Sequence, residues 1–306
     1  MQQITIHANA KINLALDVLN RRPDGYHTVR MIMQSLSLCD TLFIQKTEKP
    51  GITLSARNPE HYPDITWDEN NLIYKAAKLF LDTCGITSGV QITIDKQIPS
   101  AAGLAGGSSD AAATLKGLNQ LFEQNLSMEE LQEMGVKLGA DVPYCIMLGT
   151  ALSEGIGEVL TPLQPAPALY CTLVKPAAGV STKYVYEHLD LATAEHPNID
   201  AVLDALDKQD IRKLCAGLGN ILEPVARTLC PEVIKIEEDL MKMGAIGACM
   251  SGSGPTVFGL FSDGNDAIEA AEYFIDHGYA ERSFVTKFYQ PPQKRKLVYD
   301  DILRTI

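Results

Sequence analysis

The stretch IPSAAGLAGGSSDAAATL, residues 98–115, constrains this chain more than any other feature of its sequence. Gly103, Gly106 and Gly107 allow the backbone to approach a ligand closely and to direct successive N–H groups at one point. Two serines follow where a helix is expected to begin, so their hydroxyls add to the free N–H groups and the positive dipole end of that helix. A flexible turn with a serine N-cap is the alternative, but the density of glycine and serine favours an anion site.

This glycine loop carries no lysine and matches neither of the common nucleotide-binding patterns. The chain contains no G-x-x-x-x-G-K-[ST] sequence, and the loop does not fit G-x-G-x-x-G. A nucleotide-binding oxidoreductase would be expected to carry the second pattern early in the chain, where it is absent. Positive charge for a phosphate ligand must therefore come from another segment.

The charge of the chain restricts its partners. The formal net charge is −12, which argues against a nucleic-acid partner because phosphate backbones bind to basic faces. The basic cluster Lys294, Arg295 and Lys296 is short and is expected to be a solvated segment. No apolar run approaches the roughly 18 residues of a membrane span, and residues 1–16 lack the features of a signal peptide. We therefore expect a cytoplasmic protein with neither a membrane nor a nucleic-acid partner.

The cysteines point to the same compartment. The chain has 7 of them, an odd number, with no C-x-x-C pair. Such spacing argues against a disulfide framework and a zinc site, and it favours a reducing environment. The 6 histidines form no H-E-x-x-H sequence, so no metal site is predicted directly from these residues.

The order of strands and helices predicts two domains. A length of 306 residues suits that number, and the proline-rich stretch TPLQPAPA suggests a boundary, which we place between domains of residues 1–162 and 163–306. Alternation in KINLALDV predicts a strand, and residues 140–158 are also expected to be mainly strand. Helices are expected at 71–85, after the glycine loop, from Ser127 to Gly139, and around 182–189, 199–207, 231–243 and 265–277. Strands at 169–174, 246–250, 256–261 and 283–289 complete an α+β sandwich, an antiparallel sheet backed by helices.

Three further features could carry chemistry, although each alone has a simpler explanation. Lys11 and Asn13 share one face of the first strand, where such residues usually meet solvent. Asp141, in GADVPY, is expected at the end of a helix, where it would gain nothing from the helix dipole and would usually be a turn residue. The second glycine-rich segment, MSGSGPTVFGLF at residues 250–261, could close over a ligand or be an ordinary turn before a strand.

Taken together and in order, these segments resemble the superfamily of galactokinase, homoserine kinase, mevalonate kinase and phosphomevalonate kinase. The resemblance rests on AKINLALDVLNRRPDGYH, IPSAAGLAGGSSDAA and MSGSGPTVFGLF, and it spans residues 8–261. Within the superfamily, K-I-N-L-x-L with R-x-D-G-Y-H, and GADVPY followed by GTALSEGIGE, resemble the 4-diphosphocytidyl-2-C-methyl-D-erythritol kinases of non-mevalonate isoprenoid biosynthesis.

The resemblance implies an N-terminal domain like the second domain of ribosomal protein S5 and a ferredoxin-like C-terminal domain. It also implies transfer of the ATP γ-phosphate to the 2-hydroxyl of the methylerythritol moiety with the help of Mg²⁺. The sequence leaves the ligands of this ion open, with Ser109 as a candidate. Such a transfer depends mainly on in-line positioning and charge neutralisation. Asp141 would accept the hydroxyl proton, and Lys11 would stabilise the developing charge.

The resemblance also implies roles for individual positions. The catalytic pair is Lys11 and Asp141, and the substrate residues are Asn13, Tyr26, His27, Thr182 and Tyr186. The ATP-binding motif comprises Pro99, Ser100, Ala101, Ala102, Gly103, Leu104, Ala105, Gly106, Gly107, Ser108 and Ser109. Ala105 stands where many relatives have glycine, and we expect its extra methyl group to cost nothing.

Two alternatives remain within this scheme. One is another kinase of the superfamily, of the homoserine or mevalonate type, against which Tyr26, His27 and GADVPY argue. The other is a ligand sensor that kept the fold and lost catalysis, which the presence of both Lys11 and Asp141 disfavours.

Overall fold

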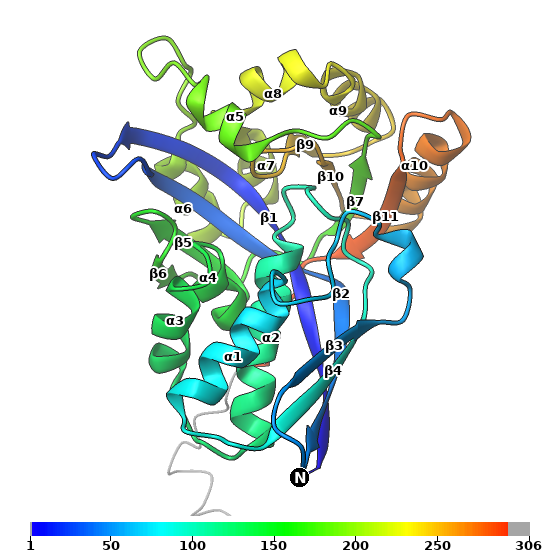
Figure 1. The fold of residues 1–306 in the computed structure, drawn as a ribbon. Coiled ribbons are helices and arrows are strands. Elements are labelled where there is room, and N and C mark those ends of the chain that lie inside the picture. Colours follow the sequence, from blue (N-terminus) through cyan, green and yellow to red (C-terminus); the bar gives the residue numbers. More distant parts are fainter. Residues whose placement is uncertain (1, 293–306) are drawn as a thin grey trace, which may run out of the picture.

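The computed structural model describes residues 2–292, which build two β-sheets joined by helices and loops (Figure 1). The first sheet has seven strands, and its main path runs in the order β3-β4-β2-β1-β8, with β5 pairing to β2 and β6 to β5. Its strands are β1 (Gln3–Arg21), β2 (His27–Thr47), β3 (Ile52–Ala56), β4 (Gly89–Asp95), β5 (Thr150–Glu154), β6 (Val159–Pro162) and β8 (Gly219–Asn220). The long β1–β2 hairpin is the frame on which the rest of this sheet is assembled.

Strand β1 is the predicted strand, but it is buried on both faces. The apolar side chains of KINLALDV are covered as expected, and Lys11, Asn13 and Asp17 on the opposite face are buried as well. The pairing with β2 shifts register between Asn9 and Lys11 and again between Asn13 and Ala15. Such bulges re-aim side chains, and here they flank the two polar residues that the resemblance singles out.

Helices cover one face of the first sheet. Helix α1 (Leu72–Thr83) packs on α2 (Gly106–Leu121) and on β3, while α2 also contacts β1 and β2. Asn71 caps α1, and the predicted stripe of Ile73, Ala77 and Phe80 is buried. Helix α3 (Met128–Val136) begins at the capping box predicted for Ser127 and Glu130. A short 3₁₀ turn, η1 (Pro59–His61), lies in the loop before α1.

The second sheet is antiparallel, in the order β11-β7-β10-β9, with β7 (Tyr170–Lys175), β9 (Gly247–Met250), β10 (Val257–Phe261) and β11 (Arg282–Lys287). Helices α9 (Glu232–Lys242) and α10 (Gly264–Asp276) pack against it. The remaining helices of the described chain are α4 (Val142–Met147), α5 (Thr182–Glu187), α6 (Ile199–Asp207), α7 (Ile211–Ala216) and α8 (Glu223–Leu229). The predicted α+β arrangement, with an antiparallel sheet backed by helices, is confirmed.

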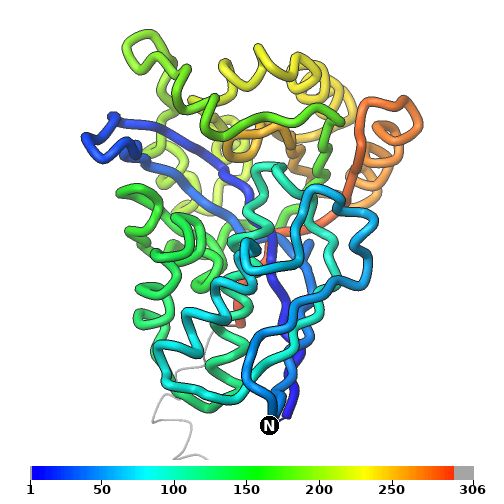
Figure 2. The backbone as a smooth tube through the Cα atoms, in the orientation of Figure 1, coloured from blue at the N-terminus to red at the C-terminus, as the bar shows by residue number. Residues whose placement is uncertain are grey.

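Two segments from the second half of the chain pair with strands of the first sheet and so connect the two sheets. Strand β8 lies beside β1 in parallel, although it follows β7 in sequence, and Phe288 forms a bridge with Leu36 of β2. Figure 2 shows the light-blue segment before α1 next to the segment that follows β4. Asn58 connects the two segments by donating to the Lys96 carbonyl at 2.8 Å. No helix within residues 2–292 combines the length and apolar character that a membrane crossing requires.

The expectation of strand over residues 140–158 is wrong in its first part. Residues Val142–Met147 form helix α4, and only Thr150–Glu154 is strand. Pro143 fits the first helical turn, where its missing N–H is not needed. All but the last residue of this helix are buried, so the sequence has no amphipathic period to separate it from a buried strand. The basic residues 294–296 lie outside the described part.

Candidate active site

A cleft of about 960 Å³ brings the separate sequence motifs together. Its walls come from β1, from the tip of the β1–β2 hairpin, from the two glycine-rich segments, and from residues near α4 and α5. The predicted residues that line it are Lys11, Asn13, Tyr26, His27, Pro99, Ser100, Ala101, Ala102, Gly103, Ala105, Gly106, Gly107, Ser108, Asp141, Thr182 and Tyr186. Segments that are far apart in the chain therefore contribute to one concave site.

The first glycine loop enters α2 through left-handed backbone. Ala101, Gly103 and Ala105 have φ of 47°, 73° and 56°, and α2 begins at Gly106 with Ala105 as its N-cap residue. An L-residue in this region is strained by about 1–2 kcal/mol. The expectation that the Ala105 methyl group costs nothing is therefore wrong, because the cost comes from the backbone conformation rather than from lack of space.

The second glycine loop, Met250–Gly254, packs directly on the first. The Ser251 hydroxyl donates to the Gly103 carbonyl at 3.0 Å. A Cβ at Gly103 would overlap the Ser251 carbonyl, so only glycine fits this crossing. Gly252 and Ser253 also line the cleft, which means that the third motif contributes to the same site as the first two.

Lys11 and Asp141 face each other across the cleft. The Lys11 Nζ atom lies 3.7 Å from Asp141 Oδ2 and donates to Asn13 Oδ1 at 2.7 Å. The side chain of Lys11 is 5% exposed and that of Asp141 is 30% exposed, so the carboxylate is the more accessible partner. The Lys11 backbone N–H donates to the Leu104 carbonyl at 3.2 Å, which joins β1 to the first glycine loop.

Asp141 does not terminate a helix as expected. It is the N-cap residue of α4, although its side chain makes no capping hydrogen bond there. A carboxylate at a helix N-terminus is stabilised by the dipole, so the argument that its position brings no electrostatic gain is also wrong. Because the Asp141 carboxylate makes no capping hydrogen bond, it is nevertheless available to a ligand in the cleft.

The cleft is also lined by a group of rings. The centroids of His27 and Tyr186 are 5.1 Å apart with an interplanar angle of 37°, and Tyr26 beside them is 59% exposed. Burial, together with the nearby Arg21, lowers the pKa of His27 below its usual value. A neutral imidazole there can both donate and accept a hydrogen bond.

Comparisons with known proteins agree with this geometry. The GHMP kinases N terminal domain family matches residues 71–149, and the GHMP kinases C terminal family matches residues 188–280. The 4-diphosphocytidyl-2-C-methyl-D-erythritol kinase of Lachnoclostridium phytofermentans is 53% identical over 95% of this chain and 99% of its own length. That of Geobacillus kaustophilus is 48% identical over 93% and 97%. The chain belongs to this kinase family.

Solved structures give the same result at the level of the fold. A crystal structure of 4-(cytidine 5′-diphospho)-2C-methyl-D-erythritol kinase superposes with a TM-score of 0.79 and 32% identity, covering 94% of this chain and all of that one. The homoserine kinase of Cytophaga hutchinsonii gives a TM-score of 0.77 at 21% identity, with coverage of 94% and 95%, which shows a shared fold alone. The predicted two-domain kinase fold is confirmed.

Two residues of the predicted ATP motif do not reach the cleft of this kinase. Leu104 and Ser109 are both buried. The Ser109 hydroxyl donates to the Asn9 carbonyl at 2.6 Å and to Cys145 Sγ at 3.3 Å, so it faces the protein interior. Ser109 therefore anchors α2 to β1 in this structure, and the nearby Ser108 hydroxyl is the one that lines the cleft.

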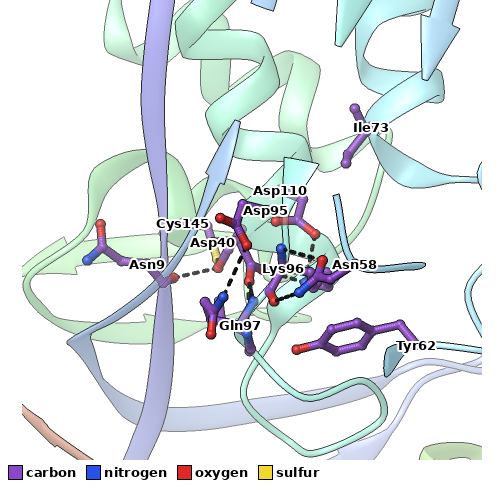
Figure 3. Close-up of polar contacts among 12 residues, drawn as sticks. Asn9, Asp40, Asn58, Tyr62, Ile73, Asp95, Lys96, Gln97, Asp110 and Cys145 are labelled. Carbon is purple, nitrogen blue, oxygen red and sulfur yellow. Dashed lines mark hydrogen bonds and ion pairs between the residues drawn. The ribbon is translucent and has the colours of Figure 1, made fainter. Parts of the chain in front are cut away.

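Sequence reasoning missed a buried ion cluster beneath the first glycine loop (Figure 3). The Lys96 ammonium contacts Asp40 of β2 and lies 2.9 Å from Asp110 Oδ2 of α2. Asp40 also accepts from the backbone N–H of Gln97 at 2.5 Å and from that of Ile98 at 2.8 Å. This cluster fixes the segment from which the glycine loop departs.

The protonation states in this cluster are shifted by burial and by mutual contact. Burial raises the pKa of Asp110 well above its usual value, although Lys96 opposes that effect. Burial alone would lower the pKa of Lys96, but Asp110 and Asp40 together raise it. The second carboxyl oxygen of Asp110 has no hydrogen-bond partner within residues 2–292. The sequence places Asp110 directly after the two serines, but no pattern in it predicts that this carboxylate pairs with Lys96.

An apolar section of the cleft was also missed. Ile65, Trp67 and Leu72 line it, and a Cβ at Gly107 of the glycine loop would lie 3.4 Å from Leu72 Cδ1. These residues come from the loop before α1 and from its first turn, which carry no recognisable motif. The one tryptophan of the chain is the only signal that could have drawn attention to this loop.

Proposed function

We propose that this kinase transfers the γ-phosphoryl group of ATP to the 2-hydroxyl of 4-diphosphocytidyl-2-C-methyl-D-erythritol. The observation that carries the proposal is the position of the Lys11–Asp141 pair. It lines the same cleft as the glycine-rich loop and the rings of Tyr26, His27 and Tyr186. The names of the relatives support the same acceptor over homoserine or mevalonate.

The glycine loop suits the phosphates of ATP. Left-handed residues before α2 turn the backbone so that free N–H groups at the start of this 16-residue helix can meet an anion. The apolar section around Trp67 and Leu72 suits the adenine ring, since it lies beside the same loop. The ATP-binding role of residues 99–109 is thus proposed for those that line the cleft, with Ser109 and Leu104 as support behind them.

The aromatic end of the cleft suits cytosine. Tyr26 and Tyr186 offer ring faces, and His27, whose ring contacts that of Tyr186, offers both a hydrogen-bond donor and an acceptor. Arg21 and Lys183 also line the cleft and give it local positive charge in a chain of net charge −12. We propose that they neutralise the diphosphate of the substrate, while Asn13 and Thr182 orient the erythritol portion.

In the reaction, the substrate hydroxyl oxygen attacks the γ-phosphorus, the bond from that phosphorus to the bridging oxygen breaks, and ADP leaves. Asp141 accepts the hydroxyl proton, since its carboxylate is exposed to the cleft and makes no capping bond. Lys11, held by Asn13, supplies positive charge to the transferring group. Most of the barrier reduction comes from this positioning and charge neutralisation.

We propose Mg²⁺ as the companion of ATP. The ion usually takes one or two protein ligands and completes its shell with phosphate oxygens and waters. Within residues 2–292 no group of three or more acidic, histidine or cysteine side chains could hold a metal alone, and this agrees with an ion carried by the nucleotide. Ser108 is the cleft residue that we propose as its ligand, and the ion would neutralise phosphate charge.

We further propose the cytoplasm as the site of action, because all seven cysteines are free. The domain boundary is proposed at residues 162 and 163, just where β6 ends.

The test of the activity is turnover of ATP against a panel of alcohols. The panel contains the cytidylyl substrate, the same methylerythritol phosphate without the cytidylyl group, homoserine and mevalonate. We expect ADP release with the first compound, a kcat/KM lower by orders of magnitude for the second, and none above background for the others. Faster turnover of homoserine or mevalonate would overturn the proposal.

A further inference from the structure

The second glycine loop contacts three separate parts of the cleft. Besides the bond from Ser251 to Gly103, the Ser253 hydroxyl lies 2.7 Å from that of Thr182. A Cβ at Gly252 would lie 3.4 Å from Lys11 Nζ, so the loop backbone passes close to the ammonium. Any displacement of this loop would therefore disturb the nucleotide cradle, Lys11 and the acceptor side at once.

One side chain outside the cleft holds this loop. Asn220, in β8, is 9% exposed, and its Nδ2 donates to the Met250 carbonyl at 2.8 Å and to the Gly252 carbonyl at 2.7 Å. Its Oδ1 accepts from the Leu222 N–H at 3.0 Å, so the amide orientation is fixed by the backbone on both sides. Strand β8 is in turn paired with β1 at Leu16, five residues beyond Lys11.

The contact to the Gly252 carbonyl sets the direction of the Ser253 N–H, while the Ser251 carbonyl, which accepts from the Gly254 N–H at 3.0 Å, sets that of the Gly252 N–H. In a trans peptide the C=O of one residue and the N–H of the next point in opposite directions. With its carbonyl drawn to Asn220, Gly252 leaves the Ser253 N–H directed away from Asn220. Neither the Gly252 N–H nor the Ser253 N–H has a hydrogen-bond partner in the described part of the chain, and both residues line the cleft. Consecutive unpaired N–H groups form a concave anion site.

We propose that Asn220 is a positioning residue, which holds the second glycine loop so that the N–H groups of Gly252 and Ser253 meet the terminal phosphate of ATP. The inference rests on the proposed role of the first glycine loop in binding ATP, and it does not depend on the identity of the acceptor. Asn220 itself touches neither substrate. It acts by binding two carbonyls that would otherwise be free to turn toward the phosphate and repel it.

The test compares the affinities for ATP and for ADP. The single tryptophan, Trp67, lines the cleft, so its fluorescence reports nucleotide binding without turnover. Asn220→Asp keeps the size of the side chain and replaces the donating nitrogen with an oxygen beside two carbonyl oxygens. We expect the ratio of ATP affinity to ADP affinity to fall at least about tenfold, because hydrogen bonds to a charged phosphate are lost only for ATP.

A matched control separates positioning from general stability. Asn119 has the same kind of role away from the cleft, since its Nδ2 donates to the Leu126 carbonyl and its Oδ1 accepts from the Leu126 N–H, both at 3.0 Å. Asn119→Asp should lower the Tm and leave the ATP to ADP ratio unchanged. If Asn220→Asp does not give folded protein by circular dichroism, Asn220→Ala removes the donors without adding repulsion and should lower the same ratio.

The outcomes are distinct. A selective loss of ATP affinity in the Asn220 variants supports the inference. Equal losses for ATP and ADP, or a lower Tm with an unchanged ratio, would show that Asn220 is structural only and would overturn it. Failure of the proposed function has a different signature, namely normal nucleotide binding by the wild-type protein without turnover of the cytidylyl substrate.

Discussion

Lys11 Nζ and Asp141 Oδ2 lie 3.7 Å apart, although 130 positions separate the two residues in the chain. The distance joins a bulged strand of the first sheet to the start of a six-residue helix. Asn13 takes one hydrogen of the ammonium, which leaves the remaining hydrogens for the carboxylate and for a ligand. We therefore expect the pair to act as one unit, so that substitutions in it are not additive.

Asp141→Asn should lower kcat by roughly 10²–10⁴-fold with little change in KM, because the amide keeps the shape but cannot accept a proton. We expect the lower end, since a loose transition state moves the hydroxyl proton late. Lys11→Ala should also lower kcat, and the double variant should lose much less than the product of the two single effects.

The control for this pair is Asp204→Asn, which removes an exposed carboxylate that pairs with Lys208 on α6. It should leave kcat unchanged. The measurement is steady-state kinetics of the two single variants, the double variant and the control. A near-normal kcat for Asp141→Asn would show that Asp141 is only a turn residue at the start of α4.

Tyr26→Ala should raise KM for the cytidylyl substrate and leave KM for ATP nearly unchanged. Stacking of a base on an aromatic ring is worth about 1–3 kcal/mol, so the rise should be roughly 5- to 150-fold. The ring is 59% exposed, and its loss should therefore cost little stability. Tyr184→Ala is the matched control, because Tyr184 stacks on His188 at 3.7 Å and does not line the cleft. Equal rises in KM for both substrates would contradict the assignment of Tyr26.

Much of the site could be predicted because its motifs have local backbone requirements. The glycine loop, the capping box at Ser127 and the strand through Lys11 are each determined by short-range sequence. The ion cluster of Lys96, Asp40 and Asp110 could not be predicted in this way. Its members come from the residue just after β4, from β2 and from α2, and they meet only because β2 and β4 are paired in the register that places Thr41 opposite Asp95.

The missed or misjudged elements share a second cause, which is burial on all sides. Helix α4 has no polar face, and β8 is only two residues long, so neither produces a periodic signal. Asn220 in β8 acquires its contacts from the fold rather than from neighbours in sequence. Ala105 was misjudged for a related reason, since side-chain volume says nothing about a left-handed φ.

Ala105→Gly should stabilise the protein by about 1 kcal/mol. The relief of left-handed strain, about 1–2 kcal/mol, exceeds the added entropy of the unfolded chain. A shift of that size corresponds to a rise in Tm of about 2 °C. Ala111→Gly, in the regular part of α2, supplies the opposite control and should lower the Tm. An equal fall in Tm for both variants would mean that the backbone at residue 105 carries no strain.

Gly103→Ala should abolish ATP binding while the protein remains folded. A Cβ at this position meets the Ser251 backbone, which is less free to move than a side chain would be. Gly106→Val should also weaken ATP binding, but by steric crowding and not by backbone strain. A Cβ at this position would lie 3.0 Å from Ile98 Cγ2, and Gly106 is in regular helix, so its backbone accepts a side chain.

Gly278→Ala is the control for Gly103→Ala. Gly278 has a similar φ of 69°, but a Cβ there has no atom within 4 Å. It should lower the Tm slightly and leave ATP affinity, measured by Trp67 fluorescence, as in the wild type. Normal ATP affinity in folded Gly103→Ala would place the phosphate cradle elsewhere.

Glu237→Gln should stabilise the protein at pH 8 and have little effect at pH 4.5. Burial, with a contribution from Glu223, raises the pKa of Glu237 from 4.5 to about 8, and its buried Oε1 has no partner within residues 2–292. A carboxyl whose pKa is raised on folding favours the folded state fully below its unfolded pKa and loses that contribution as the pH rises through the folded pKa. Between pH 4.5 and 8 the stability of the wild type should therefore fall by roughly 1.4 kcal/mol per pH unit from this group.

Glutamine mimics the neutral form at every pH, so the Tm of Glu237→Gln should decline less over that range. Glu238→Gln is the matched control, because the adjacent carboxylate is exposed and paired with Lys242, and its Tm should follow that of the wild type at each pH. Parallel pH curves for Glu237→Gln and the wild type would show that Arg227 keeps the Glu237 carboxylate ionised throughout.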